Sequence, residues 1–444
     1  MPTSVSLATN RTRRTSLLCL LYFCQGLPWG FATIALLAML SEAGHPKSAT
    51  AAVVAFAILP WTFKFFWAPM IDSIRMPSLG IRRPWIIIAQ SCMALTLLTA
   101  VSMGELENNS TLTYIAWVFF VHNCFASLQD VATDALAIDL LEDKERGRVN
   151  GMMWGSKLFG IAIGGAGMAT VMTSFGIHTA VMVQVGVLLS VLFLVIMWRE
   201  RDGERLLPWT LGSQQGDIEK VTGFLITGRE LIRALSTRTT AMLVLVALSM
   251  AVAEGIYDPV TTEFFVQHLG WTAMQYAQTQ GTIGVGAEVS GALLGGFLCD
   301  RFGQRRIAVV GITMFMATLL TFSLTESAWD EPWYPHVLLL PLFRGFFAMT
   351  TVSMFSLYMK VSWTTAAASQ FTLYMSMNNL SYWFGASLVT WLEGASFPSS
   401  LADYYLLGGL LPLITLMLLF SFSPELKTPD TLKESILAPV SQQG

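Results

Sequence analysis

Acidic side chains occur inside long apolar stretches of this chain, where an ionised group is costly. Asp130 and Asp134 are four residues apart in one stretch and share a helix face, and Glu254 and Asp258 repeat that spacing in another. Glu288 lies in the middle of a third stretch. If these stretches cross a membrane, each charge costs at least about 2.5–3.5 kcal/mol and needs a partner or a purpose. A buried carboxylate that changes partners can carry a proton, so we expect these five to be the proton-coupling candidates.

Three basic residues lie in similar stretches and could hold an anion. The planar guanidinium of Arg344 can bind a carboxylate or a phosphate through two hydrogen bonds. Lys64 is a second candidate, although its place near the end of a stretch also suits a side chain that reaches for the membrane surface. Lys157 and Asp134 lie about 12 Å and 10 Å from the same surface. A pair of Lys157 with Asp134 or Asp130 is therefore geometrically reasonable.

Each of these charges also has a purely structural interpretation. Asp130 or Asp134 could form a permanent ion pair with Lys157 that fixes the packing of two helices. Arg344 could pair with a carboxylate of Glu254, Asp258 or Glu288, and a bound anion would then displace that carboxylate. The sequence leaves both interpretations open.

Neutral polar side chains within the stretches add further candidate ligand contacts. Amides and aromatic rings together suit a sugar or a peptide, which they bind through hydrogen bonds and stacking. Hydrogen bonds between helices are the structural alternative. The candidate ligand contacts are therefore Gln25, Lys64, His122, Gln129, Lys157, Arg344, Asn378, Asn379 and Tyr382.

Membrane-spanning helices are the elements that must position these residues. Hydrophobic residues make up 54% of the 444 residues and charged residues only 12%, against roughly 25% charged in soluble domains. Apolar runs of about 20 residues, which is enough to cross a hydrocarbon core, recur along the whole chain. We predict twelve spans, near residues 16–40, 49–72, 84–104, 112–141, 149–173, 177–198, 239–267, 273–299, 306–325, 335–361, 366–394 and 402–422.

One long polar segment divides these spans into two groups of six. It contains the piece LGSQQGDIEK and ends in GFLITGRELIRALST, whose apolar residues have the spacing of an amphipathic helix on a membrane surface. We therefore predict a six-helix bundle over 1–198, a cytoplasmic linker with an amphipathic helix over 199–238, a second six-helix bundle over 239–424 and a cytoplasmic tail over 425–444.

The basic residues indicate how the chain crosses the membrane. All but four of the 26 Lys and Arg residues fall on the side that carries the N-terminal arginines. Positive residues mark the cytoplasmic side, so we predict a multi-pass protein with both termini in the cytoplasm. The five cysteines lie in or at the edge of spans, and we expect no disulfide framework and no metal site.

Two basic turns repeat at the same place in the two groups. WAPMIDSIRMPSLGIRRPW follows the second span of the first group, and GGFLCDRFGQRR follows the second span of the other. The first span of each group also shares a polar residue, a Gly and a nearby Pro, in CQGLPWG and AEGIYDP. The prolines indicate either softened or broken helix geometry at equivalent places in the two groups or two incidental kinks. Together these repeats indicate two copies of one six-helix unit, and folds built in that way mostly move small solutes.

The pattern G-x-x-x-D-R-x-G-x-R-R after the second span of a half resembles the major facilitator superfamily. Within it, QGLPWG, PWTFKFFWAPMIDS, GIRRPWI, QDVATDALAIDLL and ERGRVNG resemble the AmpG-like branch. That branch contains permeases for anhydro-muropeptides, acetyl-CoA transporters and some siderophore-uptake permeases. The first basic turn departs from the superfamily pattern, because its spacing from Asp to Arg is longer and no Arg directly follows Asp72.

The resemblance also implies a role for the basic turns. Such turns join neighbouring helices at the cytoplasmic face while the carrier is open outward, and they part when it opens inward. Asp139 ends the fourth span, where we expect it to contact Arg146 or Arg148. The implied cytoplasmic gate consists of Asp72, Arg82, Arg83, Asp139, Arg146, Asp300, Arg301, Arg305 and Arg306.

We therefore expect a secondary active transporter, coupled to protons, that imports a polar, anionic small solute such as an anhydro-muropeptide by alternating access. A siderophore or acetyl-CoA-type permease of the same branch is the alternative. Two alternatives come from other classes of function. A membrane-embedded acyl transferase would need a nucleophile with a nearby base. A transporter-like sensor often carries an enlarged soluble domain. The sequence contains no phosphate-binding loop of the form G-x-x-x-x-G-K-[ST], so nothing in it suggests ATP hydrolysis. We expect no enzyme activity, no cofactor and no nucleic-acid partner, but a monomer in the lipid bilayer of a bacterial inner membrane.

Overall fold

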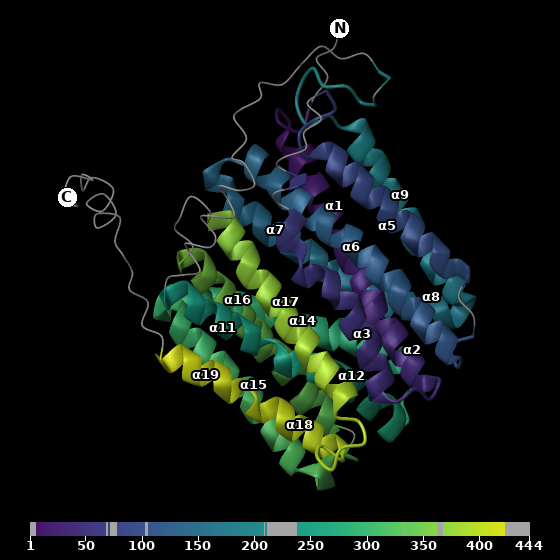
Figure 1. The fold of residues 1–444 in the computed structure, drawn as a ribbon, viewed down its shortest axis with the longest axis vertical. Coiled ribbons are helices and arrows are strands. Elements are labelled where there is room, and N and C mark those ends of the chain that lie inside the picture. The colour runs from purple at the N-terminus through teal and green to yellow at the C-terminus, as the bar shows by residue number, and fades with distance from the viewer. Residues whose placement is uncertain are drawn as a thin grey trace, which may run out of the picture.

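Long helices form almost all of the regular structure of this chain (Figure 1). The computed structural model describes residues 6–67, 70–71, 78–102, 105–207, 209–210, 238–331, 333–361 and 367–421. Within these ranges, eleven helical spans are long and apolar enough to cross a membrane. The remaining predicted span, 366–394, coincides with α17 (Ala367–Trp391), whose polar residues lower its hydropathy. The expectation of an all-helical membrane protein with twelve spans is confirmed.

We call residues 6–198 the first half of the structure. Its helices are α1 (Arg11–Gly30), η1 (Phe31–Leu36), α2 (Leu37–Glu42), α3 (Lys47–Thr62), η2 (Lys64–Phe66), α5 (Arg83–Thr99), η3 (Ala100–Ser102), α6 (Asn109–Leu140), α7 (Asp143–Ala162), η4 (Ile163–Gly167), α8 (Met168–Phe175) and α9 (Ile177–Met197).

We call residues 238–421 the second half. Its helices are α11 (Arg238–Met250), α12 (Val252–Glu263), η5 (Phe264–His268), α13 (Ala273–Thr279), η6 (Gln280–Gly284), α14 (Val285–Phe302), α15 (Gln304–Leu324), η7 (Glu326–Ala328), η8 (Pro335–Leu339), α16 (Leu340–Val361), α17, α18 (Leu401–Leu410) and α19 (Pro412–Ser421). The predicted amphipathic helix at 223–237 and the tail at 425–444 lie outside the described residues.

The helices pack in the same order in both halves. In the first half, α1 packs on α7, α3 and α5 pack on α6, and α5 packs on α9. In the second half, α12 packs on α17, α14 and α15 pack on α16, and α15 packs on α18. Each half therefore repeats one arrangement of six spans, as the duplicated turns predict.

A glycine in each half allows the first span to approach the fifth closely. A Cβ atom on Gly26 would lie 2.1 Å from the Lys157 carbonyl oxygen, and one on Gly255 would lie 2.2 Å from that of Tyr382. Pro28 lies inside α1 and Pro259 inside α12, and a π-helical turn follows each. The expectation that helix geometry is softened at these two places is confirmed.

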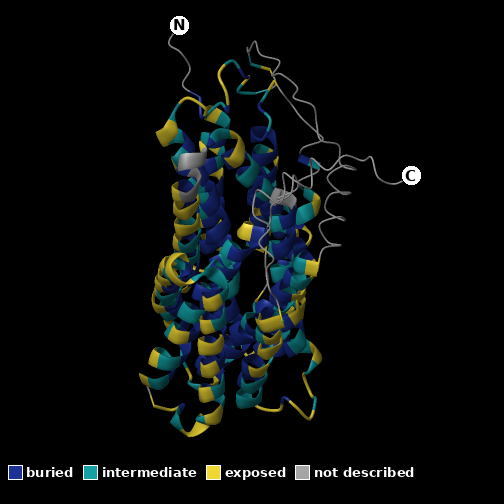
Figure 2. Ribbon diagram, turned by 90° about the vertical axis from the view of Figure 1, so that its left-hand side faces the viewer, coloured by how far each residue is buried: buried dark blue, intermediate teal, exposed yellow. Residues whose placement is uncertain are grey.

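The two halves meet along a surface that we call the seam, where α3 of the first half lies against α12 and α17 of the second. Figure 1 shows α3 and α17 side by side between the two halves. Figure 2 shows buried residues within the bundles and exposed ones along their outer sides. Large apolar side chains lie exposed on those outer sides, among them Phe193, Leu293 and Met417, and a lipid environment suits them.

The two ends of the bundle differ in charge. We call the end with Arg11, Arg82 and Arg305 the basic end, and the opposite end, with Glu42 and Glu331, the acidic end. The distribution of positive residues predicts that the basic end faces the cytoplasm, and this orientation stays a prediction.

Candidate functional site

Arg344 on α16 is surrounded by carboxylates of the second half. Its Nη2 lies 2.5 Å from Asp258 Oδ1 on α12. Its Nη1 lies 3.3 Å from Glu288 Oε1 on α14 and 3.4 Å from Glu254 Oε1 on α12. Tyr382 on α17 donates its hydroxyl to Asp258 Oδ2 at 2.6 Å. The structure thus brings together five residues predicted from sequence, which we call the arginine cluster, and Arg344 has the salt bridges of the structural interpretation.

Two further residues complete the surroundings of the guanidinium. The Arg344 guanidinium carbon lies 5.1 Å from the centre of the Tyr257 ring. Gln280, with its amide oxygen turned toward the guanidinium, accepts from Arg344 Nε and Nη2 at 2.7 Å. Sequence reasoning missed both residues. Their only signal was that each lies in a span that already carries a charged candidate.

A second group of charges lies in the first half, and we call it the lysine cluster. Lys64 Nζ lies 3.1 Å from Asp130 Oδ2, and both side chains are almost fully buried. Tyr22 on α1, which sequence reasoning missed, donates its hydroxyl to Asp134 Oδ1 at 2.5 Å. Lys157 belongs to the same cluster. Lys64 therefore does not extend to the membrane surface but supplies the buried partner of Asp130.

The expected ion pair of Lys157 with Asp130 or Asp134 does not form in the described structure. Lys157 Nζ instead lies 4.9 Å from the centre of the Trp61 ring, 5.3 Å from that of Trp154 and 5.9 Å from that of Tyr22. The prediction of this pair was wrong because equal depth in the membrane does not fix which way a helix face points. Lys64, on η2 just after α3, pairs with Asp130 instead.

The two clusters differ in formal charge. In the lysine cluster, Lys64 and Lys157 balance Asp130 and Asp134. In the arginine cluster, a single guanidinium faces three carboxylates, so two negative charges would remain if all were ionised. A membrane interior disfavours such an excess, and protons or a cation must compensate for it.

Two other candidate ligand contacts point away from both clusters. His122 Nδ1 lies 3.2 Å from the Met93 carbonyl oxygen on α5. Gln129 Nε2 donates to Gln90 Oε1, also on α5, at 2.6 Å. Both side chains join α6 to α5 inside the first half, so the structural alternative, a hydrogen bond between helices, describes them.

The remaining polar candidates lie on α1 and α17. Asn379 Nδ2 donates to the Trp61 carbonyl oxygen at 3.1 Å and so joins α17 to α3. Asn378 Oδ1 and both amide atoms of Gln25 are buried and have no hydrogen-bond partner among the described residues. Unpaired buried polar atoms are uncommon, and a ligand or a water molecule can satisfy them.

The residues of the predicted cytoplasmic gate lie at the basic end. Arg82 Nε lies 2.8 Å from Asp139 Oδ2, and within the described residues Asp139 forms no ion pair with Arg148. The expected contact with Arg146 stays a prediction. The end of α6, which carries Asp139, meets the turn before α5, which carries Arg82. Asp72 and the side chain of Arg146 lie outside the described residues.

Arg83 and the start of the linker form one anchored unit at the same end. Arg83 donates to five backbone carbonyl groups, among them those of Val195, Arg205 and Leu206. Glu200 Oε2 accepts from the backbone N–H groups of Arg82 and Arg83 at 2.9 and 3.1 Å. These contacts all lie within the first half and its linker.

A carboxyl group in this unit has an altered affinity for protons. Burial, together with the neighbouring Glu200 carboxylate, raises the pKa of Glu204 to about 7. The charge of this anchor therefore changes close to neutral pH.

The described hydrogen bonds and ion pairs of the gate residues of the second half stay within that half. Asp300, Arg301 and Arg306 are exposed at the end of α14 and the start of α15. Arg305 Nη2 donates to the Phe420 carbonyl oxygen on α19 at 3.1 Å. Their role as a latch stays a prediction.

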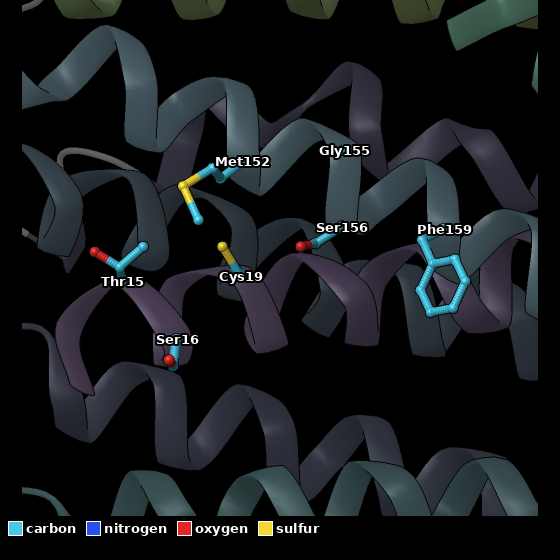
Figure 3. A pocket seen from close by; sticks show the side chains of 7 residues that line it. All are labelled: Thr15, Ser16, Cys19, Met152, Gly155, Ser156 and Phe159. Carbon is cyan, nitrogen blue, oxygen red and sulfur yellow. The ribbon is translucent and has the colours of Figure 1, made fainter. Parts of the chain in front are cut away.

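A hollow of about 440 Å³ between α1 and α7 is separate from both clusters. Figure 3 shows its lining, which contains no charged side chain and consists of Thr15, Ser16, Cys19, Met152, Gly155, Ser156 and Phe159. We therefore place the candidate site at the two clusters beside the seam.

Solved structures show the same fold at low sequence identity. The nucleoside transporter NupG superimposes with a TM-score of 0.66 at 13% identity, covering 92% of this chain and 99% of the other. A D-xylose-proton symporter superimposes with a TM-score of 0.67 at 11% identity, covering 94% and 99%.

Sequence relatives are named as permeases and transporters. The anhydromuropeptide permease of Escherichia coli is 24% identical over 302 residues, which are 67% of this chain. The match spans only 58% of the length of that permease. A putative transporter AmpG 3 of Rickettsia prowazekii is 22% identical over 378 residues, covering 83% of this chain and 87% of the relative.

The family model of the Major Facilitator Superfamily matches residues 18–386 and, in a second match, 243–442. Together with the repeated six-span packing, this match confirms the family expected from the sequence motifs. The chain belongs to the Major Facilitator Superfamily.

Proposed function

We propose that this protein is a proton-coupled secondary active transporter that imports an anionic solute of the anhydro-muropeptide class across a bacterial inner membrane, with both termini in the cytoplasm. The arginine cluster is the observation that carries the proposal. It places one guanidinium, three carboxylates and the Tyr382 hydroxyl on four different spans, two of which, α12 and α17, also form the seam. The cluster is therefore joined through α12 and α17 to the surface at which the two halves meet.

The distances within the cluster suggest how it would handle protons. Asp258 has the shortest contact with Arg344 and also accepts from Tyr382, so it is the carboxylate held most closely in the cluster. Glu254 and Glu288 have longer contacts, and about a fifth of each side chain is exposed, at 22% and 21%. These two glutamates are the groups that we propose take up protons from water, since one arginine cannot balance three negative charges.

Coupling follows from competition for the same guanidinium. An anionic group that approaches Arg344 would displace the more weakly held carboxylates, and each displaced carboxylate would then bind a proton. The loaded cluster would carry less net charge, which lowers the cost of closing the seam around it. Release of the solute would return the carboxylates to Arg344 and the protons to water.

The choice of solute rests on two supports. The E. coli relative named as an anhydromuropeptide permease matches 67% of this chain. The cations Lys157 and Arg344, the aromatic rings and the unpaired amides suit a solute that has an acidic group, sugar rings and amide bonds.

Uptake into proteoliposomes tests the proposal. A pH gradient, acidic outside, should drive the accumulation of a radiolabelled anhydro-muropeptide well above its equilibrium level. The double variant Glu254→Gln/Glu288→Gln should lose at least about tenfold of this accumulation but still exchange labelled for unlabelled solute. Glu331→Gln, at the exposed acidic end, is the matched control and should behave like the wild type.

Two results would contradict the proposal. Full gradient-driven accumulation by the double variant would show that the arginine cluster does not couple transport to protons. Uptake of a ferric siderophore or of acetyl-CoA, without uptake of the muropeptide, would show that the proposed solute class is wrong.

A further inference from the structure

Lys157 differs from the other intramembrane cations of the described structure in its partners. Lys64 is paired with Asp130, and Arg344 is surrounded by three carboxylates. The contacts of Lys157 Nζ are with the faces of three aromatic rings, and within the described ranges no carboxylate pairs with it. Ring faces stabilise an ammonium group but do not neutralise its charge. Lys157 is therefore held in place without a carboxylate in direct contact, and the charges of Asp130 and Asp134 act on it only from beyond ion-pair distance.

Trp61 supplies an independent sign of a missing ligand. Its ring is the one nearest to Lys157, at 4.9 Å, and only 7% of the residue is exposed. Its indole Nε1–H group is buried without a hydrogen-bond partner among the described residues. A buried donor without an acceptor is destabilising, so the site gains when an acceptor enters.

Both residues lie where the two halves of the molecule meet. The Trp61 carbonyl oxygen accepts from Asn379 on α17, and Lys64, next to the same ring at 6.0 Å, lies 3.9 Å from the Met375 sulfur. Trp154, the second ring around Lys157, lies 6.2 Å from Phe355 of α16, centre to centre. A solute bound here would contact both halves, as a transported solute must.

We propose that Lys157 and Trp61 form the docking point for the acidic group of the transported solute. The Lys157 ammonium binds a carboxylate or phosphate oxygen, and the Trp61 indole N–H donates to a neighbouring hydroxyl or amide oxygen of the same solute. The exposed face of Trp154 offers a stacking surface for a sugar ring. This inference rests on the proposed function and adds an anion subsite in the first half to the one proposed at Arg344.

The solute class that fits has three features. It carries an anionic group, an oxygen acceptor a few bonds away and an apolar ring face. A neutral sugar lacks the first feature, and a small inorganic anion lacks the other two.

Binding to the purified, full-length protein in lipid nanodiscs tests this assignment. The two probes are an anhydro-muropeptide and the same compound with its carboxylates converted to amides. Wild-type protein should prefer the acid at least about tenfold. Lys157→Met should lose this preference, and Lys157→Arg should retain most of it. Trp61→Phe, which keeps a ring but removes the N–H donor, should weaken the binding of both probes several-fold.

Control variants separate docking from general damage to the fold. Trp117→Phe and Lys360→Met change the same residue types at exposed positions, and both should bind like the wild type. The Lys157→Arg variant shows whether a cation, and not the lysine packing alone, is required.

The outcomes distinguish this inference from the proposed function. If wild-type protein binds and accumulates the acid but Lys157→Met retains the preference, the docking assignment is wrong and the transporter proposal stands. If wild-type protein binds neither probe, the solute class is wrong, and both proposals are overturned together.

Discussion

At the scale of single residues, each half contains a tyrosine that donates a hydrogen bond to a buried aspartate. Tyr22 donates to Asp134 in the first half, and Tyr382 donates to Asp258 in the second. The two aspartates differ in their other partners, because Asp258 also pairs with Arg344 and Asp134 has no pair with a lysine among the described contacts. If the arginine cluster handles protons, removing the second hydroxyl should matter more than removing the first.

The substitution Tyr382→Phe tests this difference. A hydrogen bond to a charged group contributes about 1.5–3 kcal/mol, and about 1.4 kcal/mol corresponds to a factor of ten. We therefore expect Tyr382→Phe to reduce gradient-driven uptake about tenfold or more, measured as initial rates in proteoliposomes. Tyr114→Phe, which removes a hydroxyl outside both clusters that donates to the Thr99 carbonyl oxygen, should leave the rate unchanged. A larger loss in Tyr22→Phe than in Tyr382→Phe would move coupling to the lysine cluster.

Sequence reasoning located the members of the arginine cluster but not every pair in the lysine cluster. Glu254, Asp258, Glu288 and Arg344 could be predicted because a charge in an apolar span is rare and needs a partner. The partner of Asp130 could not be predicted in the same way, because helix rotation decides whether Lys64 or Lys157 reaches it. Tyrosines such as Tyr22 are common at membrane depth and give no such signal.

At the scale of helices, a glycine fixes the distance between α1 and α7. The close contact of Gly26 with the Lys157 backbone holds these helices together and positions the Lys157 side chain. The same pairing of the first and fifth spans recurs through Gly255 and Tyr382 in the second half. Close backbone approach through small residues is a common way to pack helices in a membrane.

The substitution Gly26→Ala should therefore separate α1 from α7. Its Cβ would lie 2.1 Å from a backbone oxygen, and overpacking of this kind costs typically about 1–3 kcal/mol. We expect a lower midpoint of thermal unfolding in detergent and weaker solute binding, since Lys157 moves with α7.

Gly155→Ala on α7 is the matched control for that substitution. No atom lies within 4 Å of the added Cβ, and alanine favours a helix over glycine by roughly 0.5–1 kcal/mol. Equal unfolding midpoints for the two variants would show that the α1–α7 contact can relax without loss.

The order of the spans could be predicted from the sequence, and their bounds to within a few residues. The apolar runs identify the spans, since a membrane requires about 20 apolar residues each time the chain crosses. The π-helical turns that follow Pro28 and Pro259 could be predicted only as softened geometry. Their exact form depends on the neighbouring helices, which periodicity does not reveal.

At the scale of the whole molecule, polar contacts between the two halves gather at the acidic end. Lys47 at the start of α3 donates its backbone N–H and its Nζ to the Glu263 carboxylate at 2.6 and 2.9 Å. Gln267 donates to the carbonyl oxygens of Ser41 and His45, both at 2.9 Å. Glu42 accepts from the backbone of Ala273 at 3.2 Å. The structure is therefore a state in which the acidic end is closed.

Such contacts must break if the molecule is to open at the acidic end. No sequence motif marked them, because Lys47 and Glu263 are 216 residues apart and only the association of the halves brings them together. The predicted latch of basic turns lies at the other end of the molecule. A carrier that alternates between two openings needs a closing contact at each end.

The Lys47–Glu263 ion pair should therefore hold the acidic end closed. Partly exposed pairs contribute about 0.2–1 kcal/mol, so Glu263→Gln should increase the open population up to about fivefold, since about 1.4 kcal/mol corresponds to a factor of ten. Spin-label distances between the halves across the acidic end should report this change, and the swap Lys47→Glu/Glu263→Lys should reverse most of it. Asp330→Asn, in a pair confined to the second half, should leave the distances unchanged. If Glu263→Gln gave wild-type distances, the remaining contacts of Gln267 and Glu42 would be sufficient to close this end.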